Sequence, residues 1–146
     1  MSTVALPHTW RPRRARIFCY SVAALLMIVL SVVAVILPDD GAREWNLPSR
    51  IGVVAVGIPI AVFLHRHADV RIIAREDGLE IVNLFRRHRL QWGEVLAVRL
   101  RRGDPWVFLD LSNGETIAAM GIQGSDGDAA PVAARQLATL VHERAG

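Results

Sequence analysis

Apolar residues fill two long stretches in the first half of the chain and alternate with polar residues through most of the second half. The first stretch, residues 17–37, is 21 residues long and contains no charged residue, proline or glycine. As an α-helix it would be about 31 Å long, close to the hydrocarbon thickness of a bilayer. Because a backbone in lipid must satisfy its own hydrogen bonds, this stretch predicts a membrane-spanning helix. The alternative is a buried helix of a soluble core, which a run this long in so short a chain does not favour.

The second apolar stretch covers residues 51–64 and is shorter, a length that also suits a core or re-entrant helix. Asn46 can cap a helix whose first turn contains Pro48, a position where proline is tolerated. The helix then becomes long enough to span a bilayer if Arg50 extends its charge to the surface. We therefore predict a helical hairpin over residues 17–67, with spans at 17–37 and 47–65 and a short outer loop.

Arginine residues are distributed unevenly around the two spans. Four precede the first, several follow the second, and the connecting loop carries only Arg43 and Arg50. Because positive residues stay in the cytoplasm, this predicts an inner-membrane protein with both termini inside. A secretory signal peptide is the alternative, but residues 35–38 form a poor cleavage site. The expected membrane-interface anchors are Trp10, Arg11, Arg13, Arg14, Arg16, Trp45, Arg50 and Arg66.

From residue 69 the apolar period falls to about two, which is typical of strands with one buried face. Strands are expected at residues 70–74, 79–84, 90–92, 95–100, 106–111 and 116–120. Residues 85–89 are expected to form a turn, and Leu96, Val98 and Leu100 to share one face. A helix is expected from residue 131 to about 144, with an apolar stripe that covers the core.

Three short motifs carry a resemblance to a known family: Asp-Gly-Leu at 77–79, Asn-Leu-Phe-Arg at 83–86 and Leu-x-Trp at 90–92. In this pattern and order of elements, residues 68–146 resemble a bacterial pleckstrin-homology (PH) domain. With two preceding spans, the chain resembles the small actinobacterial PH-domain membrane proteins of the low-molecular-weight protein antigen 6 type. Members of that group mostly lack an assigned activity, so the resemblance implies a fold and a location more than a mechanism.

The expected fold is therefore α+β: a two-helix transmembrane hairpin followed by a PH-like antiparallel β-barrel or sandwich, capped by a C-terminal α-helix. Residues 1–16 form a cytoplasmic arginine-rich tail, 17–67 the hairpin and 68–146 the cytoplasmic PH-like domain. The acidic hairpin at Glu76 and Asp77 argues against a specific inositol-phosphate pocket, because PH domains that bind phosphoinositides usually build that site around a basic first hairpin.

The residue inventory excludes several classes of function. All 17 basic residues are arginine, the net charge is only +3, and Cys19 is the single cysteine. No disulfide, zinc cluster, catalytic triad or phosphate-binding loop can be assembled from these motifs. The sequence therefore predicts no enzyme, no cofactor, no metal, no small-molecule substrate and no nucleic-acid partner. His65 and His67, two residues apart on a helix, are expected to anchor the interface rather than bind a metal.

The candidate contact residues are five arginines in two turns, which an up-and-down meander brings to the same end of the sheet as the membrane exit. Each basic residue near an anionic leaflet contributes about 1 kcal/mol. The alternative is that these arginines are only solvated turn residues. The five are Arg86, Arg87, Arg89, Arg101 and Arg102.

The expected function is a non-catalytic, membrane-anchored interaction module that binds partner proteins, acidic phospholipid or both at the inner leaflet. The alternative is an accessory subunit of a larger integral-membrane complex, held mainly by its transmembrane helices. Small residues on the helices permit close packing against such a partner without requiring it. They are Ala23, Ala24, Ser31, Ala34 and Ala55.

Overall fold

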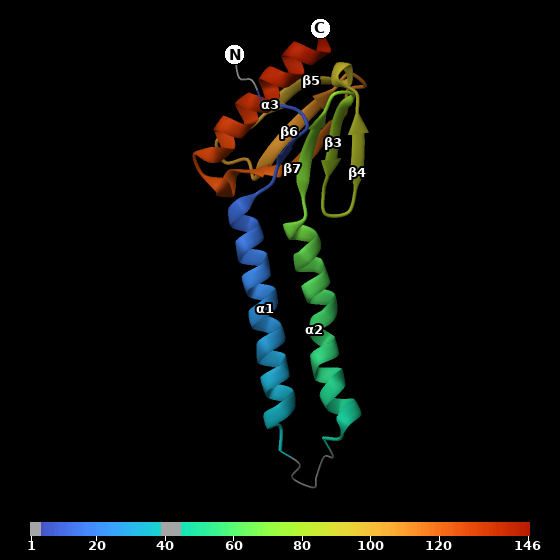
Figure 1. Ribbon diagram of the computed structural model, residues 1–146, viewed down its shortest axis with the longest axis vertical. Coiled ribbons are helices and arrows are strands. Elements are labelled where there is room, and N and C mark those ends of the chain that lie inside the picture. Colours follow the sequence, from blue (N-terminus) through green and yellow to red (C-terminus); the bar gives the residue numbers. More distant parts are fainter. Residues whose placement is uncertain (1–3, 39–44) are drawn as a thin grey trace. The chain divides into compact units, whose positions relative to one another are not determined.

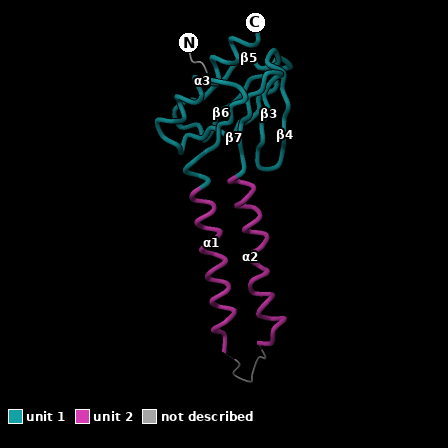
Figure 2. Tube along the Cα trace, in the orientation of Figure 1, with its two compact units in different colours: residues 1–16, 69–146 teal, residues 17–68 magenta. Residues whose placement is uncertain are grey.

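The computed structural model describes residues 4–38 and 45–146, and the chain divides into two compact units (Figure 1, Figure 2). We call Met1–Arg16 together with Asp69–Gly146 the module, and Ile17–Ala68 the hairpin. The hairpin is therefore inserted between two parts of the module along the chain.

Two helices make up the hairpin: α1, Arg13–Ile36, and α2, Leu47–Ala68. Both are long and apolar enough to cross a membrane, and few of their side chains are buried. Asn46 caps α2 as expected, since its Oδ1 accepts a hydrogen bond of 3.1 Å from the Ser49 N–H. By length and composition, both helices are therefore candidate membrane spans.

Arg50 links the C-terminal end of α1 to the residue before Asn46 at the start of α2. Its guanidinium donates hydrogen bonds to the carbonyl oxygens of Val35, at 2.9 Å, and Leu37, at 3.0 Å, and its Nε to that of Trp45, at 3.0 Å. Carbonyls at a helix C-terminus lack partners within the helix, and a cation there is favourable. Arg50 thus ties α2 to the end of α1.

Among the described residues of the module, seven strands form two antiparallel sheets, and a helix packs against them (Figure 1). The first sheet has the order β1-β2-β3-β4 and the second the order β5-β6-β7, so the described strands form a sandwich and not one closed barrel. The strands are β1 His8–Trp10, β2 Arg71–Arg75, β3 Gly78–Val82, β4 Arg87–Leu90, β5 Val95–Arg99, β6 Trp106–Leu111 and β7 Thr116–Gln123. Short 3-10 turns, η1 Trp92–Glu94 and η2 Gly124–Asp126, precede β5 and α3, and α3 spans Ala129–Ala145.

Strand β1 lies within residues 1–16, for which the sequence predicts a tail without regular structure. It pairs with β2 in antiparallel register, with Trp10 opposite Ile72. Trp10 was expected at the membrane interface, and this is corrected: its side chain lies in the module core, only 6% exposed, and its Nε1–H donates to Gln136 Oε1 on α3 at 3.3 Å.

Two local differences from the expected strands have clear causes. The chain reverses over residues 83–86, where the Asn83 N–H donates to the Arg86 carbonyl at 2.9 Å, so Arg87 and Arg89 lie on strand β4 instead of in a turn. A β-bulge between Val95 and Ala97 breaks the alternation of β5 and leaves Leu96 67% exposed, not on the buried face.

The core fills the space between the sheets, and α3 packs against β5 and η1 at its side (Figure 1). The expected helix stripe of Val132, Gln136, Leu137, Leu140 and Val141 is confirmed in part: Leu137, Leu140 and Val141 are buried, whereas Val132 is 46% exposed. Asn83 joins the two sheets, because its side-chain amide donates to the Ala118 carbonyl at 2.6 Å and accepts from the Met120 N–H at 3.0 Å.

Candidate functional site

Three exposed arginines share the outer face of the β1–β4 sheet, and we call Arg75, Arg87 and Arg89 the arginine face. In the antiparallel register Glu80 lies opposite Arg89, and Val82 opposite Arg87. Directly opposed residues point to the same side of a sheet. Arg87 and Arg89 of β4 therefore stand beside Glu80 of β3, on the side away from the core.

The carboxylate of Glu80 is at the centre of this face. Its side chain is only 10% exposed, and it accepts a hydrogen bond of 3.1 Å from Arg75 and forms an ion pair of 3.8 Å with Arg87. A buried carboxylate requires such partners, since desolvation without them is costly. The arginines remain largely exposed, at 56% for the Arg75 side chain and 61% for Arg87. Glu80 therefore holds guanidiniums in place without removing them from solvent.

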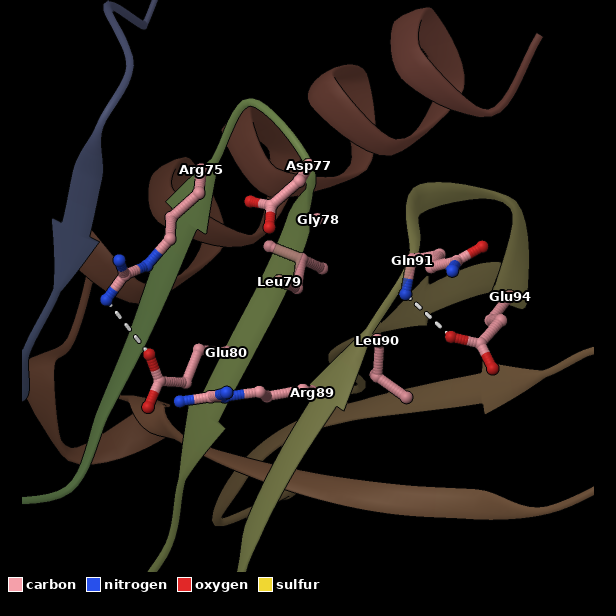
Figure 3. Close-up of a pocket in the computed structure, with 9 residues that line it drawn as sticks. All are labelled: Arg75, Asp77, Gly78, Leu79, Glu80, Arg89, Leu90, Gln91 and Glu94. Carbon is pink, nitrogen blue, oxygen red and sulfur yellow. Dashed lines mark hydrogen bonds and ion pairs between the residues drawn. The ribbon is translucent and has the colours of Figure 1, made fainter.

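Arg75 and Arg89 also line a cavity of about 480 Å³ on this face (Figure 3). Figure 3 shows both side chains extending toward Glu80 from the neighbouring strands, and Asp77 and Glu94 also line the cavity. Glu94 is engaged in a turn, where it accepts a 2.6 Å hydrogen bond from the Gln91 N–H. The cavity thus combines cationic and anionic groups and is not a uniformly positive pocket.

The other two predicted contact residues, Arg101 and Arg102, lie in the turn between β5 and β6. The Arg101 N–H donates to Asp104 Oδ2 at 2.7 Å, which closes the turn, and both arginines are exposed. The structure thus separates the predicted set: Arg87 and Arg89 lie on a strand of the first sheet, Arg86 lies in the turn before it, and Arg101 and Arg102 lie in a turn of the second sheet.

Each of the two turns is linked to other parts of the module. Arg71, three residues after the hairpin ends, is in register with Val82, just before the Arg86 turn. The turn at Arg101 is followed by Pro105, whose carbonyl accepts from Gly124, and η2 in turn binds the segment before the hairpin. The expectation that both turns lie at one end was based on a single meander, whereas the strands form two sheets.

The residues expected as interface anchors have different environments. Arg14 is tied to the module, since its N–H donates to Asp126 Oδ1 at 3.0 Å and its guanidinium to the Ser125 carbonyl at 3.3 Å. Arg11, Arg13 and Arg66 are exposed, and Arg16 and Trp45 are partly buried. Arg50 binds carbonyl oxygens at the end of α1, as described above.

The remaining polar candidates have structural partners. Tyr20 Oη lies 3.1 Å from His65 Nδ1 in the hairpin. Trp92 is buried and its Nε1–H donates to the Arg75 and Glu76 carbonyls, each at 3.2 Å. Among the described residues, 4–38 and 45–146, no group of three or more acidic, histidine or cysteine side chains is placed to hold a metal ion.

On the second sheet, the Asp110 carboxylate accepts hydrogen bonds from the side chains of Arg99 and Thr116. Arg99 donates to its two oxygens at 2.5 and 2.7 Å, and Thr116 Oγ1 donates at 2.7 Å. The hydrogen bond from Arg99, followed by that from Thr116, lowers the pKa of Asp110 from its ordinary value of 3.8. The stabilisation it gives is therefore present above that value and is lost as the pH falls through the lowered pKa.

The lowered pKa of Asp110 predicts how the stability of a variant depends on pH. Asp110→Asn should be less stable than the native chain at neutral pH, and the difference should narrow as the pH falls below about 4. Urea unfolding of the full chain in detergent, followed by near-ultraviolet circular dichroism over a pH series, measures it. Glu115→Gln is the matched control, since the Glu115 carboxylate accepts an exposed hydrogen bond from the Asn113 side-chain amide and its backbone bonds survive the substitution. A stability difference for Asp110→Asn that stays constant with pH would contradict the assignment.

Residues 69–139 match the model of one protein family, described as bacterial PH domain. The match begins after the hairpin, so it excludes strand β1, which completes the first sheet. No curated protein and no solved structure matches the chain. PH domains are generally non-catalytic interaction modules that commonly bind proteins or phospholipids.

Proposed function

We propose that the chain is a membrane-anchored, non-catalytic interaction protein. The hairpin crosses the cytoplasmic membrane twice, and the module lies on the cytoplasmic side, where it binds partner proteins or acidic phospholipid. One observation carries this proposal: a PH-like module with exposed arginines is continuous in the chain with two apolar helices that bury few of their side chains. The excess of arginine outside the connecting loop supports the orientation.

The lipid part of the proposal uses the five predicted arginines. If each approaches an anionic leaflet it contributes about 1 kcal/mol, and the attraction falls off within a Debye length. Because Arg101 and Arg102 lie in a turn of the second sheet, and Arg87 and Arg89 on a strand of the first, the two groups can be tested separately. Arg11, Arg13 and Arg66, exposed near the helix ends, are the proposed inner-interface anchors, and Trp45 and Arg50 those of the outer interface.

Topology is the first test. In a Cys19→Ala background, single cysteines at Ser112 in the module and at Gly41, which lies outside the described residues, should label from opposite sides of the membrane. Ser112→Cys should react only after the cells are opened, and Gly41→Cys in intact spheroplasts. Reaction of Ser112→Cys from outside would contradict the proposed location.

Lipid docking is tested on the full chain in nanodiscs, because a fragment starting at residue 69 lacks β1. Hydrogen exchange of residues 83–91 and 100–105 is compared in phosphatidylcholine alone and in a mixture with phosphatidylglycerol. At low salt the mixture should slow exchange in at least one segment, and high salt should abolish the effect. Equal exchange in both lipids would rule out docking on acidic phospholipid.

A further inference from the structure

Strand β4 has a free edge. It is the last strand of the β1-β2-β3-β4 sheet and pairs only with β3 among the strands that the structure describes. An edge strand presents backbone N–H and C=O groups that another extended chain can pair with. Native proteins often protect such edges with charged side chains, so the charges along the edge determine which extended segments can pair with it.

The two sides of β4 differ in chemistry. Arg87 and Arg89 stand on the outer face beside Glu80, whereas Leu90 points to the inner side and packs against the module core. A strand added along this edge would place alternate residues opposite the arginines, and the others over Leu90 and His88. The chemistry that fits is an extended segment in which acidic and apolar residues alternate.

We propose that the β4 edge, with the arginine face, binds an acidic, extended segment of a partner protein by strand addition. This inference deepens the proposed function and rests on it, since it names the partner chemistry for one surface of the module. Glu80 acts as a positioning residue, because it orients Arg75 and Arg87 through its 3.1 Å hydrogen bond and 3.8 Å ion pair.

Two other occupants fit this surface less well. A second copy pairing through the same edge would set Arg87 and Arg89 against like charges, which is destabilising for directly opposed residues. A bilayer of acidic lipid presents uniform negative charge, and the same cavity is lined by the carboxylates of Asp77, Glu80 and Glu94. A strand brings its acidic side chains only to the positions opposite arginine.

The test uses the full chain in nanodiscs of phosphatidylcholine and three synthetic peptides. In the first peptide glutamate alternates with valine and threonine, in the second lysine replaces glutamate, and in the third a central proline interrupts the glutamate series. The first should bind and slow hydrogen exchange in residues 87–91. It should bind about tenfold more tightly than the second, since two cross-strand charge pairs change sign, and more tightly than the third, which cannot continue the ladder.

Substitutions of arginine distinguish binding at the β4 edge from attraction by positive charge elsewhere on the module. Arg87→Gln with Arg89→Gln should weaken binding of the glutamate peptide about tenfold, whereas Arg101→Gln with Arg102→Gln should leave it unchanged. Arg87→Glu with Arg89→Glu should instead select the lysine peptide. If a variant fails to fold, the comparison of the three peptides on the native chain still decides.

The proposal is overturned if the glutamate peptide binds no better than the lysine peptide, or if the proline peptide binds equally well. It is also overturned if exchange in residues 87–91 slows with phosphatidylglycerol nanodiscs but not with the peptide. That last result would assign the face to lipid and leave the proposed function intact. If neither the glutamate peptide nor phosphatidylglycerol changed exchange in the module, and cysteine labelling placed the module outside the membrane, both the inference and the proposed function would be contradicted.

Discussion

Replacing Trp10 with alanine is expected to lower the free energy of unfolding of the module by about 3–5 kcal/mol. The indole is 6% exposed within the core between the sheets and α3, and its N–H binds Gln136 at 3.3 Å. The truncation leaves a cavity and removes the hydrogen bond that links β1 to α3. Urea unfolding of the full chain in detergent, followed by near-ultraviolet circular dichroism, measures the loss.

Trp45→Ala is the matched control. Trp45 lies in the hairpin, where only its backbone carbonyl has a described bond, to Arg50, and that group survives the substitution. Module unfolding should therefore stay within about 0.5 kcal/mol of the native value. If both tryptophan variants behaved alike, β1 would not be part of the folded module, and residues 1–16 would be the free tail that the sequence indicates.

The missed strand shows where the sequence pattern stops being informative. His8–Trp10 has three residues with one buried side chain, and Pro7 and Pro12 stand close on either side. A strand this short shows no alternation, and its partner β2 follows only after the whole hairpin. The strand exists because β2 offers it a ladder and the core offers Trp10 a site. The ladder and the core site are tertiary effects, which the local sequence does not show. Strand β6, by contrast, can be predicted from the sequence because its buried positions alternate along its whole length.

The candidate site was predictable only in part for a similar reason. The basic run at residues 86–89, which contains Arg86, Arg87 and Arg89, is visible in the sequence. Its position between two apolar stretches predicts a turn. The hydrogen bond from Asn83 to Arg86 closes the reversal earlier and leaves Arg87 and Arg89 on β4. Arg75 and Glu80 were missed because their association depends on the β2–β3–β4 register, which a single sequence does not specify.

Replacing Gly121 with alanine should destabilise the module by about 3 kcal/mol or more, at the upper end of overpacking effects. Gly121 lies on β7 where that strand crosses the start of β2. An added Cβ would contact the Ile72 nitrogen and lie 2.6 Å from the Arg71 carbonyl carbon and 2.8 Å from the Arg71 Cα. These are backbone atoms of a paired strand and cannot rotate away as a side chain would, so the two sheets would have to separate.

Gly93→Ala is the control, because no heavy atom lies within 4 Å of the Cβ position there. Alanine also restricts the unfolded chain, so this variant should remain within about 1 kcal/mol of the native stability. Hydrogen exchange of β2 and β7 in the full chain should accelerate in Gly121→Ala and not in Gly93→Ala. Native-like exchange in Gly121→Ala would show that the sheets tolerate a wider separation. The close approach of β2 and β7 would then not be what fixes β2, and with it the arginine face, in place.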